Sequence, residues 1–258
     1  NQAIALALSR WQGQDLAQRF ILMTHPATHW DPRALECLQA VFRADETVMI
    51  AGPTLLEAHR VPRDEEGDSE IECTNSIQSQ GQEILRDRRW VSCREGRAYE
   101  EEEEGLSRVV LGVAASCVMI RASAWESLNV MGEWLDPDLP PGQEFCDLMW
   151  RAAWLRKKAV VVPAAKVWVE HTPAVLEADS SVLEWKNDDV WLRCRHLPWI
   201  LCRRWRSAFS RLLHPWKRVS TFKVERAERL FHKARLLRGG RLATREEMRK
   251  WFRAKPTG

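Results

Sequence analysis

The sequence lacks a CxxC cysteine pair and a long hydrophobic run. Its seven cysteines are scattered at spacings that fit no zinc pattern, so we expect the reduced thiols of a cytosolic protein and not the disulfides of a secreted one. The longest nearly apolar run, residues 109–120, is far shorter than the roughly 20 residues that a membrane-spanning helix needs. These features argue against a disulfide scaffold and against a membrane span in this sequence.

Charge is distributed unevenly along the 258 residues. Residues 185–258 carry 21 Lys and Arg against 6 Asp and Glu, a net charge of +15, whereas residues 1–184 carry a net charge of −12. With 45% hydrophobic residues, the chain is long enough for one large domain or for a domain with an appendage. An acidic body with a basic tail predicts a folded domain joined to a segment that is attracted to polyanions.

Hydrophobic periodicity indicates strands alternating with helices, which is typical of an α/β layered sheet. Gly52-Pro53 is expected to end the strand before it, and Pro32 is expected at the first position of a helix. We predict helices at residues 2–19, 122–130 and 144–154 and one starting at Asp31, and strands at residues 20–23, 48–51, 159–162 and 167–169.

Two polar regions interrupt or follow this pattern. Residues 60–107 are expected to form a long solvated excursion, partly disordered, with a lid or an acceptor loop as the alternative. After residue 175 the chain is predicted to be helical, basic and amphipathic. Apolar stripes occur at residues 201–212 and 227–237, and Thr244 with Glu247 forms a capping box.

Four stretches, in this order, resemble the second half of a GT-A glycosyltransferase of inverting family two, close to its rhamnosyltransferase-like members. The first is residues 1–32, which end in THPATHWDP and look like the helix and strand that lead to the metal-binding turn. The other three are similar to the acceptor segment, the helix with the catalytic acids and the final strand with its His. They read CVMIRASAW with VMGEWLD, GQEFCDLMWR, and VVVPAAKVWVEH.

The resemblance implies a partial Rossmann-like GT-A fold with two parts. Residues 1–175 would be the acceptor-side part of the catalytic domain, and residues 176–258 a basic helical extension. The chain starts with Asn, and the nucleotide-binding half would precede it, so we expect the chain to be a piece of a longer protein. The implied activity is that of a hexosyltransferase, moving a sugar from a nucleotide sugar to a cell-envelope or lipid-linked glycan.

The resemblance also implies roles for individual residues. Asp147 and Glu144 would be the catalytic carboxylates, because a carboxylate must accept the proton of the acceptor hydroxyl. The donor would be bound by His25, Thr28 and His171, and the acceptor by Arg121, Trp134 and Arg151.

The sequence departs from the family at two central positions. Ala27 replaces the metal-binding Asp of the turn, and a methyl group cannot hold the Mg²⁺ or Mn²⁺ ion that would neutralise the diphosphate leaving group. His171 matches the metal or phosphate His, so it is the one predicted metal ligand. Phe145 replaces the middle acid, which is often the base. A degenerate, non-catalytic binding module is therefore the alternative to an active transferase.

Each site residue also has a structural interpretation. Asp147 could pair with Arg151, Glu144 could be an acid favoured by the helix dipole, and His171 could bond to the backbone. Arg121 could form structural ion pairs, Trp134 could belong to the core, and His25 and His29 could be ordinary loop residues.

The basic extension predicts a partner of its own. Lys and Arg near an anionic membrane are worth about 1 kcal/mol each, so we expect residues 185–258 to cap the sheet and to touch the inner face of the cell membrane. This corresponds to a cytoplasmic, peripheral protein of envelope polysaccharide synthesis, and nucleic acid is not an expected partner. A third hypothesis is a polyanion-binding protein dominated by this tail.

Overall fold

The computed structural model of the chain describes residues 1–63, 69–85, 89–100, 105, 107–170, 224–239 and 242–253. The role predicted for His171 and the apolar stripe predicted at residues 201–212 lie outside the described residues.

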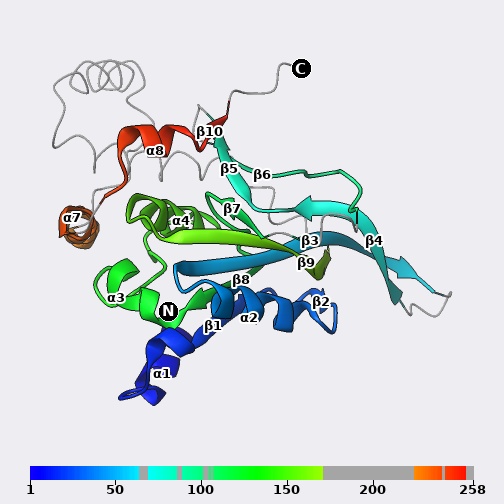
Figure 1. Cartoon of the computed structure of the whole chain (residues 1–258), viewed down its shortest axis with the longest axis horizontal. Coiled ribbons are helices and arrows are strands. Elements are labelled where there is room, and N and C mark those ends of the chain that lie inside the picture. Colours follow the sequence, from blue (N-terminus) through cyan, green and yellow to red (C-terminus); the bar gives the residue numbers. More distant parts are fainter. Residues whose placement is uncertain are drawn as a thin grey trace.

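The described residues form a mixed α/β fold (Figure 1). Short 3-10 helices cover Leu16–Gln18 and Ala122–Ala124. The α-helices are α1 (Gln2–Arg10), α2 (Ala34–Ala44), α3 (Trp125–Leu128), α4 (Gln143–Trp154), α7 (Val224–Gly239) and α8 (Arg245–Arg249). The strands are β1 (Phe20–Thr24), β2 (Thr28–Trp30), β3 (Val48–Pro62), β4 (Ser69–Ser79), β5 (Gln82–Leu85), β6 (Trp90–Ser92), β7 (Arg108–Val110), β8 (Cys117–Arg121), β9 (Lys158–Glu170) and β10 (Phe252–Arg253).

The main sheet has seven strands in the order β1-β8-β3-β9-β2, with β4 added to β3 and β7 added to β9. The central pair, β3 and β9, is parallel, and the other pairs in this sheet are antiparallel. The predicted α/β class is thus confirmed as a mixed α/β fold. The two long strands β3 and β9 form the centre of its sheet.

Helices cover both faces of this sheet, with α2 on one side and α4 on the other (Figure 1). Because side chains alternate along a strand, Ile50 and Val161 pack in the cluster that contains α4 residues, whereas Ala51 and Val160 pack in the cluster that contains α2 residues. Burial on both faces explains why these strands read as continuous apolar runs in the sequence.

The prediction that Gly52-Pro53 ends a strand is wrong, since β3 runs through both residues. A Cβ atom at position 52 would lie 2.7 Å from Val113 Cβ, so Gly52 allows a close approach between β3 and the segment before β8. Pro53 lies beside a register shift between β3 and β9, and an irregularity in the ladder is where a strand tolerates proline. Gly52 and Pro53 therefore mark a close approach and a register shift within β3, and the strand continues beyond them.

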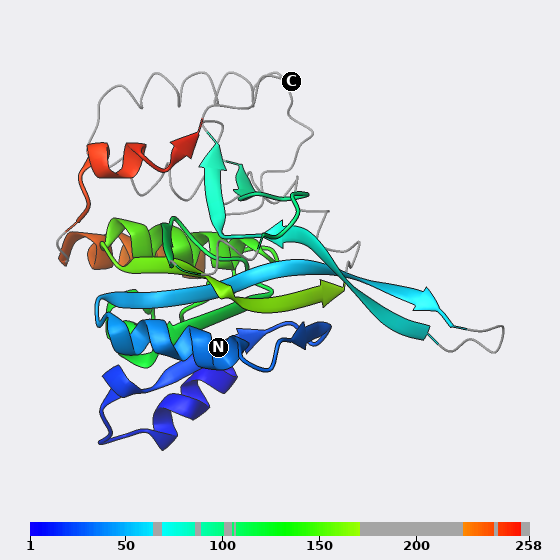
Figure 2. The same ribbon diagram turned by 45° about the vertical axis from the view of Figure 1, so that its right-hand side comes forward.

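The predicted excursion at residues 60–107 is largely β-structure in its described parts. Strand β4 pairs with β3 from Leu55 to Pro62, and the pair projects from the rest of the fold as an arm (Figure 2). Beyond it, β5 forms a small sheet with β6 and β10. The polar composition reflects exposure on both faces of the arm, where a strand needs no apolar side.

Several predicted boundaries also move. The first helix ends at Arg10 instead of continuing to residue 19. Helix α2 begins at Ala34, because Asp31 accepts backbone hydrogen bonds from Arg33 and Ala34 and forms a turn around Pro32. The helix predicted at residues 122–130 is a 3-10 turn followed by the four-residue α3. The two strands predicted at residues 159–162 and 167–169 are one, β9, whereas α4, β1 and the capping box at Thr244 are confirmed.

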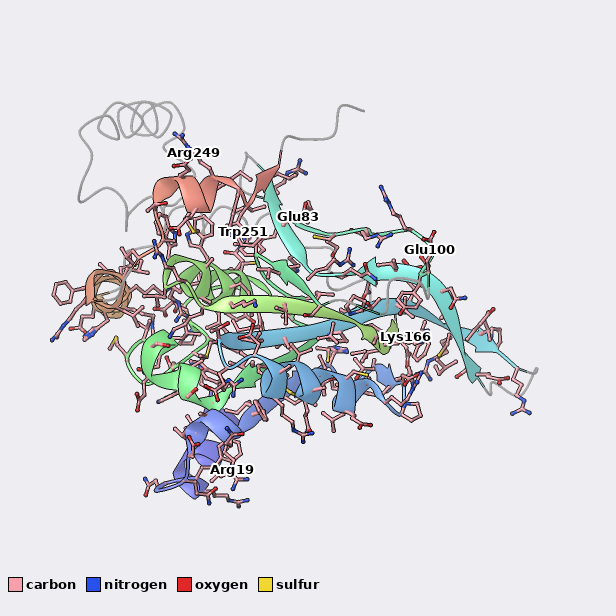
Figure 3. All side chains as sticks on the ribbon, in the orientation of Figure 1. Arg19, Glu83, Glu100, Lys166, Arg249 and Trp251 are labelled. Carbon is pink, nitrogen blue, oxygen red and sulfur yellow. The ribbon has the colours of Figure 1, made fainter. Side chains whose placement is uncertain are left out.

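The described part of the basic extension packs on the body. Strand β10 pairs in parallel with β5, and Ala243 and Met248 share an apolar cluster with Trp150 of α4. Figure 3 shows Trp251 between α8 and α4. In α7 the predicted apolar stripe is wrong in one respect: Phe231 is 49% exposed, and Lys233 is fully buried in the inward-facing position.

The close approach at Gly52 leads to a stability prediction. Gly52→Ala should lower the free energy of unfolding by about 1–3 kcal/mol, the usual cost of overpacking, because its methyl group would collide with Val113. Urea denaturation measures this change. Gly105→Ala is the matched control, since a Cβ there meets nothing within 4 Å. Adding Val113→Ala should recover part of the loss, and an additive double variant would contradict the steric explanation.

Candidate functional site

Helix α4 places the predicted catalytic acid Asp147 on the same helical face as Arg151. The helix begins after Gly142, whose φ of 88° suits a glycine at the N-cap, and it ends before a short connection to β9. Its residues Leu148, Met149 and Ala152 pack on the sheet. Residues four apart lie side by side on a helix, so Asp147 and Arg151 face away from this contact as a pair.

The carboxylate of Asp147 is held by two cations. Arg151 Nε donates to Oδ2 at 2.9 Å, and Lys233 Nζ of α7 donates to Oδ1 at 3.0 Å. Asp147 is only 3% exposed, so both oxygen atoms are directed into the protein. An ion pair with Arg151 is the structural alternative to a catalytic role for Asp147, and the structure contains this ion pair.

Arg151 also fixes the loop that follows α3. Its guanidinium donates to the carbonyl oxygen atoms of Leu128 and Trp134. Trp134, predicted to bind the acceptor, is fully buried in the main core and packs against Trp125 at 5.5 Å between ring centroids. These contacts correspond to the core interpretation of Trp134 and to a structural function for Arg151.

Sequence reasoning missed the cations on α7 and their carboxylate partners. Lys233 Nζ lies 2.5 Å from Asp136 Oδ2 as well as 3.0 Å from Asp147. Arg229, one turn earlier, pairs with Glu133 at 2.6 Å and with Asp136 and Asp138 at 3.3 Å each. We define the acidic centre as the four carboxylates of Glu133, Asp136, Asp138 and Asp147 together with the three cations Arg151, Arg229 and Lys233. Two cations four residues apart in a helix, and three acids within residues 133–138, were the available signal.

The electrostatics of the acidic centre favour a charged Asp147. Burial by itself raises the pKa of this carboxyl group, but the nearby Lys233 and Arg151 outweigh burial and lower the pKa below its ordinary value. A base accepts a proton most readily when its pKa is near the working pH. In this arrangement Asp147 is a poor proton acceptor and a strong ion-pair partner.

Glu144, the other predicted catalytic acid, lies in the first turn of α4, where the helix dipole favours a negative charge. Its Oε2 atom is buried and has no hydrogen-bond partner among the described residues. Phe145, which follows it, packs against the main core. Glu144 is therefore the predicted acid with a buried carboxylate oxygen that has no hydrogen-bond partner among the described residues.

A second group of contacts forms around the turn after β1, at the carboxyl end of β9. Thr28 donates its hydroxyl to the carbonyl oxygen of His25 at 2.8 Å, and the His25 ring accepts from the Ala27 amide at 3.2 Å. The Glu170 amide donates to the Ala27 carbonyl oxygen at 3.1 Å. The structure thus brings the predicted donor residues His25 and Thr28 together, close to the residue that precedes His171.

The same end of the sheet carries an ion cluster of three residues. Glu170 lies 3.1 Å from His29 Nε2 and 3.0 Å from an Arg60 nitrogen atom. The hydrogen bonds from Arg60 and His29 lower the pKa of Glu170. This cluster ties β2, β3 and β9 together where the arm begins.

Arg121 belongs to a third group at the opposite end of the sheet. Its guanidinium donates to the carbonyl oxygen atoms of Val48, Ala17 and Phe42, and Val48 is the first residue of β3. Glu170 pairs with Ala58, ten residues further along that strand, which corresponds to roughly 30 Å at the usual rise per residue. Arg121 is thus positioned to join β3 and α2, far from the turn that contains His25 and Thr28.

The comparisons with known proteins add a distant likeness. No protein-family model matches the chain, and no curated protein matches it. Among solved structures it is similar to the crystal structure of GalNAc-T7 with UDP, GalNAc and Mn²⁺, a GT-A glycosyltransferase. The identity is 15% and the TM-score 0.47, over 72% of this chain and 35% of that chain. This is a likeness to part of a fold, and it assigns the chain to no family.

The described residues show neither a metal-binding cluster nor a membrane-spanning helix. Within the described ranges, no three His, Cys, Asp or Glu side chains are grouped so that they could hold a metal ion. None of the helices described is both long enough and apolar enough to span a bilayer.

The burial of Asp147 leads to a prediction about acid stability. Its lowered folded-state pKa means that it stabilises the fold above the pKa of the unfolded chain, and that this contribution disappears as the pH falls through the folded-state value. Asp147→Asn should therefore lower the free energy of unfolding at pH 7 by about 3–5 kcal/mol, the cost of breaking a buried ion pair. It should also flatten the decline of stability below pH ~4.

Denaturant unfolding between pH 3 and pH 7 measures both effects. Glu36→Gln, an exposed carboxyl group on α2, is the control and should change stability by less than about 0.5 kcal/mol. An Asp147→Asn protein with wild-type stability and an unchanged acid profile would show that the ion pairs contribute nothing.

Proposed function

We propose that the chain is a glycosyltransferase-like protein that binds a nucleotide sugar and a glycan, and that the described arrangement is a binding state rather than a transferring state. The observation that carries this proposal is the double ion pair of Asp147, with Arg151 and Lys233, in a buried position. A carboxylate held in this way can organise a site but cannot reach an acceptor hydroxyl.

The donor would bind at the turn that contains His25 and Thr28. This turn is closed against the end of β9 by the Ala27–Glu170 hydrogen bond, and His171 follows directly in the sequence. The His25 ring, whose Nδ1 atom accepts from the Ala27 amide, can donate from Nε2 to a phosphate oxygen atom, whereas the Thr28 hydroxyl donates to the His25 carbonyl oxygen and holds the turn. Since position 27 carries no carboxylate, donor binding here would depend on these groups and not on Mg²⁺ or Mn²⁺.

The glycan would bind on the side of α4 that carries Glu144. Helix α4 leads back to the beginning of β9, so its amino end is directed toward the carboxyl end of that strand. A donor at the His25 turn and a glycan at the first turn of α4 would then approach from the same end of β9, which is the arrangement that a transferase needs.

Sugar transfer to a cell-envelope or lipid-linked acceptor is the second candidate function. Glu144 favours it, because its Oε2 atom has no hydrogen-bond partner among the described residues and the residue is only half-buried, so a change of rotamer would bring this oxygen atom to an acceptor hydroxyl. In that case Glu144 would be the base and Asp147 a positioning residue.

A titration with nucleotides tests the proposal. We expect UDP, GDP or dTDP to bind the chain with affinities that differ less than about threefold between Mn²⁺ and EDTA, since residue 27 supplies no metal ligand. Ala27→Asp should introduce a dependence on Mn²⁺ of about tenfold or more, as expected for a new hard oxygen ligand. Calorimetry measures both values, and Ala40→Asp, at an exposed position of α2, is the control.

Oligosaccharide binding and release of nucleoside diphosphate separate the two candidates. Glycan binding without release supports the binding state, and release that is lost in Glu144→Gln supports transfer. A chain that binds neither nucleotide nor glycan would overturn the proposal.

A further inference from the structure

Helix α7 is attached to the body by ion pairs of Arg229 and Lys233. Among the side chains of α7 that the structure describes, Leu230, Lys233 and Ala234 are buried. Arg229 and Lys233 reach four carboxylates of the body. Ion pairs are therefore a main part of the described attachment of α7, and a helix held in this way can open separately from the core when those pairs break.

With α7 in place, the acidic centre carries a net charge of only −1. Its four carboxylates face three cations, two of which come from α7. Without the helix the body would retain only Arg151, and the centre would carry a net charge of −3. Asp136 and Asp147, now 6% and 3% exposed, would become accessible to solvent and to any ligand.

The outward face of α7 suits a different environment. Phe231 is 49% exposed, and the neighbouring positions His232 and Arg235 are exposed as well. The segment to which α7 belongs, residues 185–258, carries a net charge of +15. An aromatic side chain among cations is the pattern of a helix that lies on an anionic lipid surface. If α7 were drawn fully onto such a surface, Arg229 and Lys233 would exchange their carboxylate partners for lipid headgroups.

We propose that α7 is a latch: Arg229 and Lys233 close the acidic centre, and an anionic lipid surface draws the helix away and exposes Asp136 and Asp147. The latch itself follows from the ion pairs, whereas its consequence for ligand access rests on the proposed function. In the closed state Lys233 occupies the oxygen atoms that a glycan hydroxyl would need. In the open state those oxygen atoms face the solvent.

Carboxyl footprinting tests the latch on the whole chain. A water-soluble carbodiimide with an amine couples to accessible carboxyl groups, and mass spectrometry measures the rate at each residue. In buffer, Asp147 should react at least tenfold more slowly than the exposed Glu36. Vesicles of phosphatidylglycerol and phosphatidylcholine should raise the rate at Asp147 at least fivefold, and vesicles of phosphatidylcholine alone should leave it unchanged.

Two variants on the same helix distinguish the latch from general electrostatic attraction. Lys233→Met should raise the Asp147 rate without lipid, because it removes the charge and keeps the length of the side chain. Arg235→Met, on the exposed face, should leave the rate in buffer unchanged. The lipid experiment needs no substitution, so it decides the question even if Lys233→Met does not fold.

An Asp147 rate that stays unchanged on phosphatidylglycerol vesicles would overturn the latch, whether the chain sediments with the vesicles or remains free. Failure of the proposed function looks different: Asp147 becomes reactive on the vesicles, and neither nucleotide nor glycan binds in either state.

Discussion

The carboxylate of Asp147, held between the guanidinium of Arg151 and the ammonium of Lys233, is the interaction on which the described arrangement depends. Removing these charges from water costs several kcal/mol per ion, and only well-formed ion pairs and hydrogen bonds offset that cost. The same Arg151 binds the carbonyl oxygen atoms of Leu128 and Trp134. One buried carboxylate therefore connects α4, the loop after α3 and α7.

The two predicted catalytic acids, Asp147 and Glu144, differ in their partners. Asp147 is neutralised by the protein itself, whereas Glu144, one turn nearer the amino end of α4, has a carboxylate oxygen without a partner among the described residues. The donor turn at His25 and Thr28 lies near the far end of β9 and is held by backbone contacts. In the proposed account, both substrates of a transferase bind while the exposure of Asp147 depends on whether α7 is in place.

The sequence was sufficient for features that have a local cause. The helix at Gln143–Trp154 follows from its apolar spacing, and the capping box at Thr244 and Glu247 follows from a four-residue pattern. Features that depend on distant partners were missed. Gly52 reads as a strand end until Val113 is seen against it, and Lys233 reads as a solvated charge until Asp136 and Asp147 are found 86 or more residues away in the chain. Likewise, Arg121 was grouped with the acceptor residues by order of motifs, although its carbonyl partners lie at the other end of the sheet.

A double-mutant cycle between Asp147→Asn and Lys233→Met measures the central interaction most directly. The coupling energy is obtained from the free energies of unfolding of the wild type, the two single variants and the double variant. A buried, hydrogen-bonded pair predicts a coupling of about 1–3 kcal/mol, with the double variant more stable than the sum of the single losses implies. A coupling within experimental error of zero would contradict the account, because α7 would then be held by something other than Asp147.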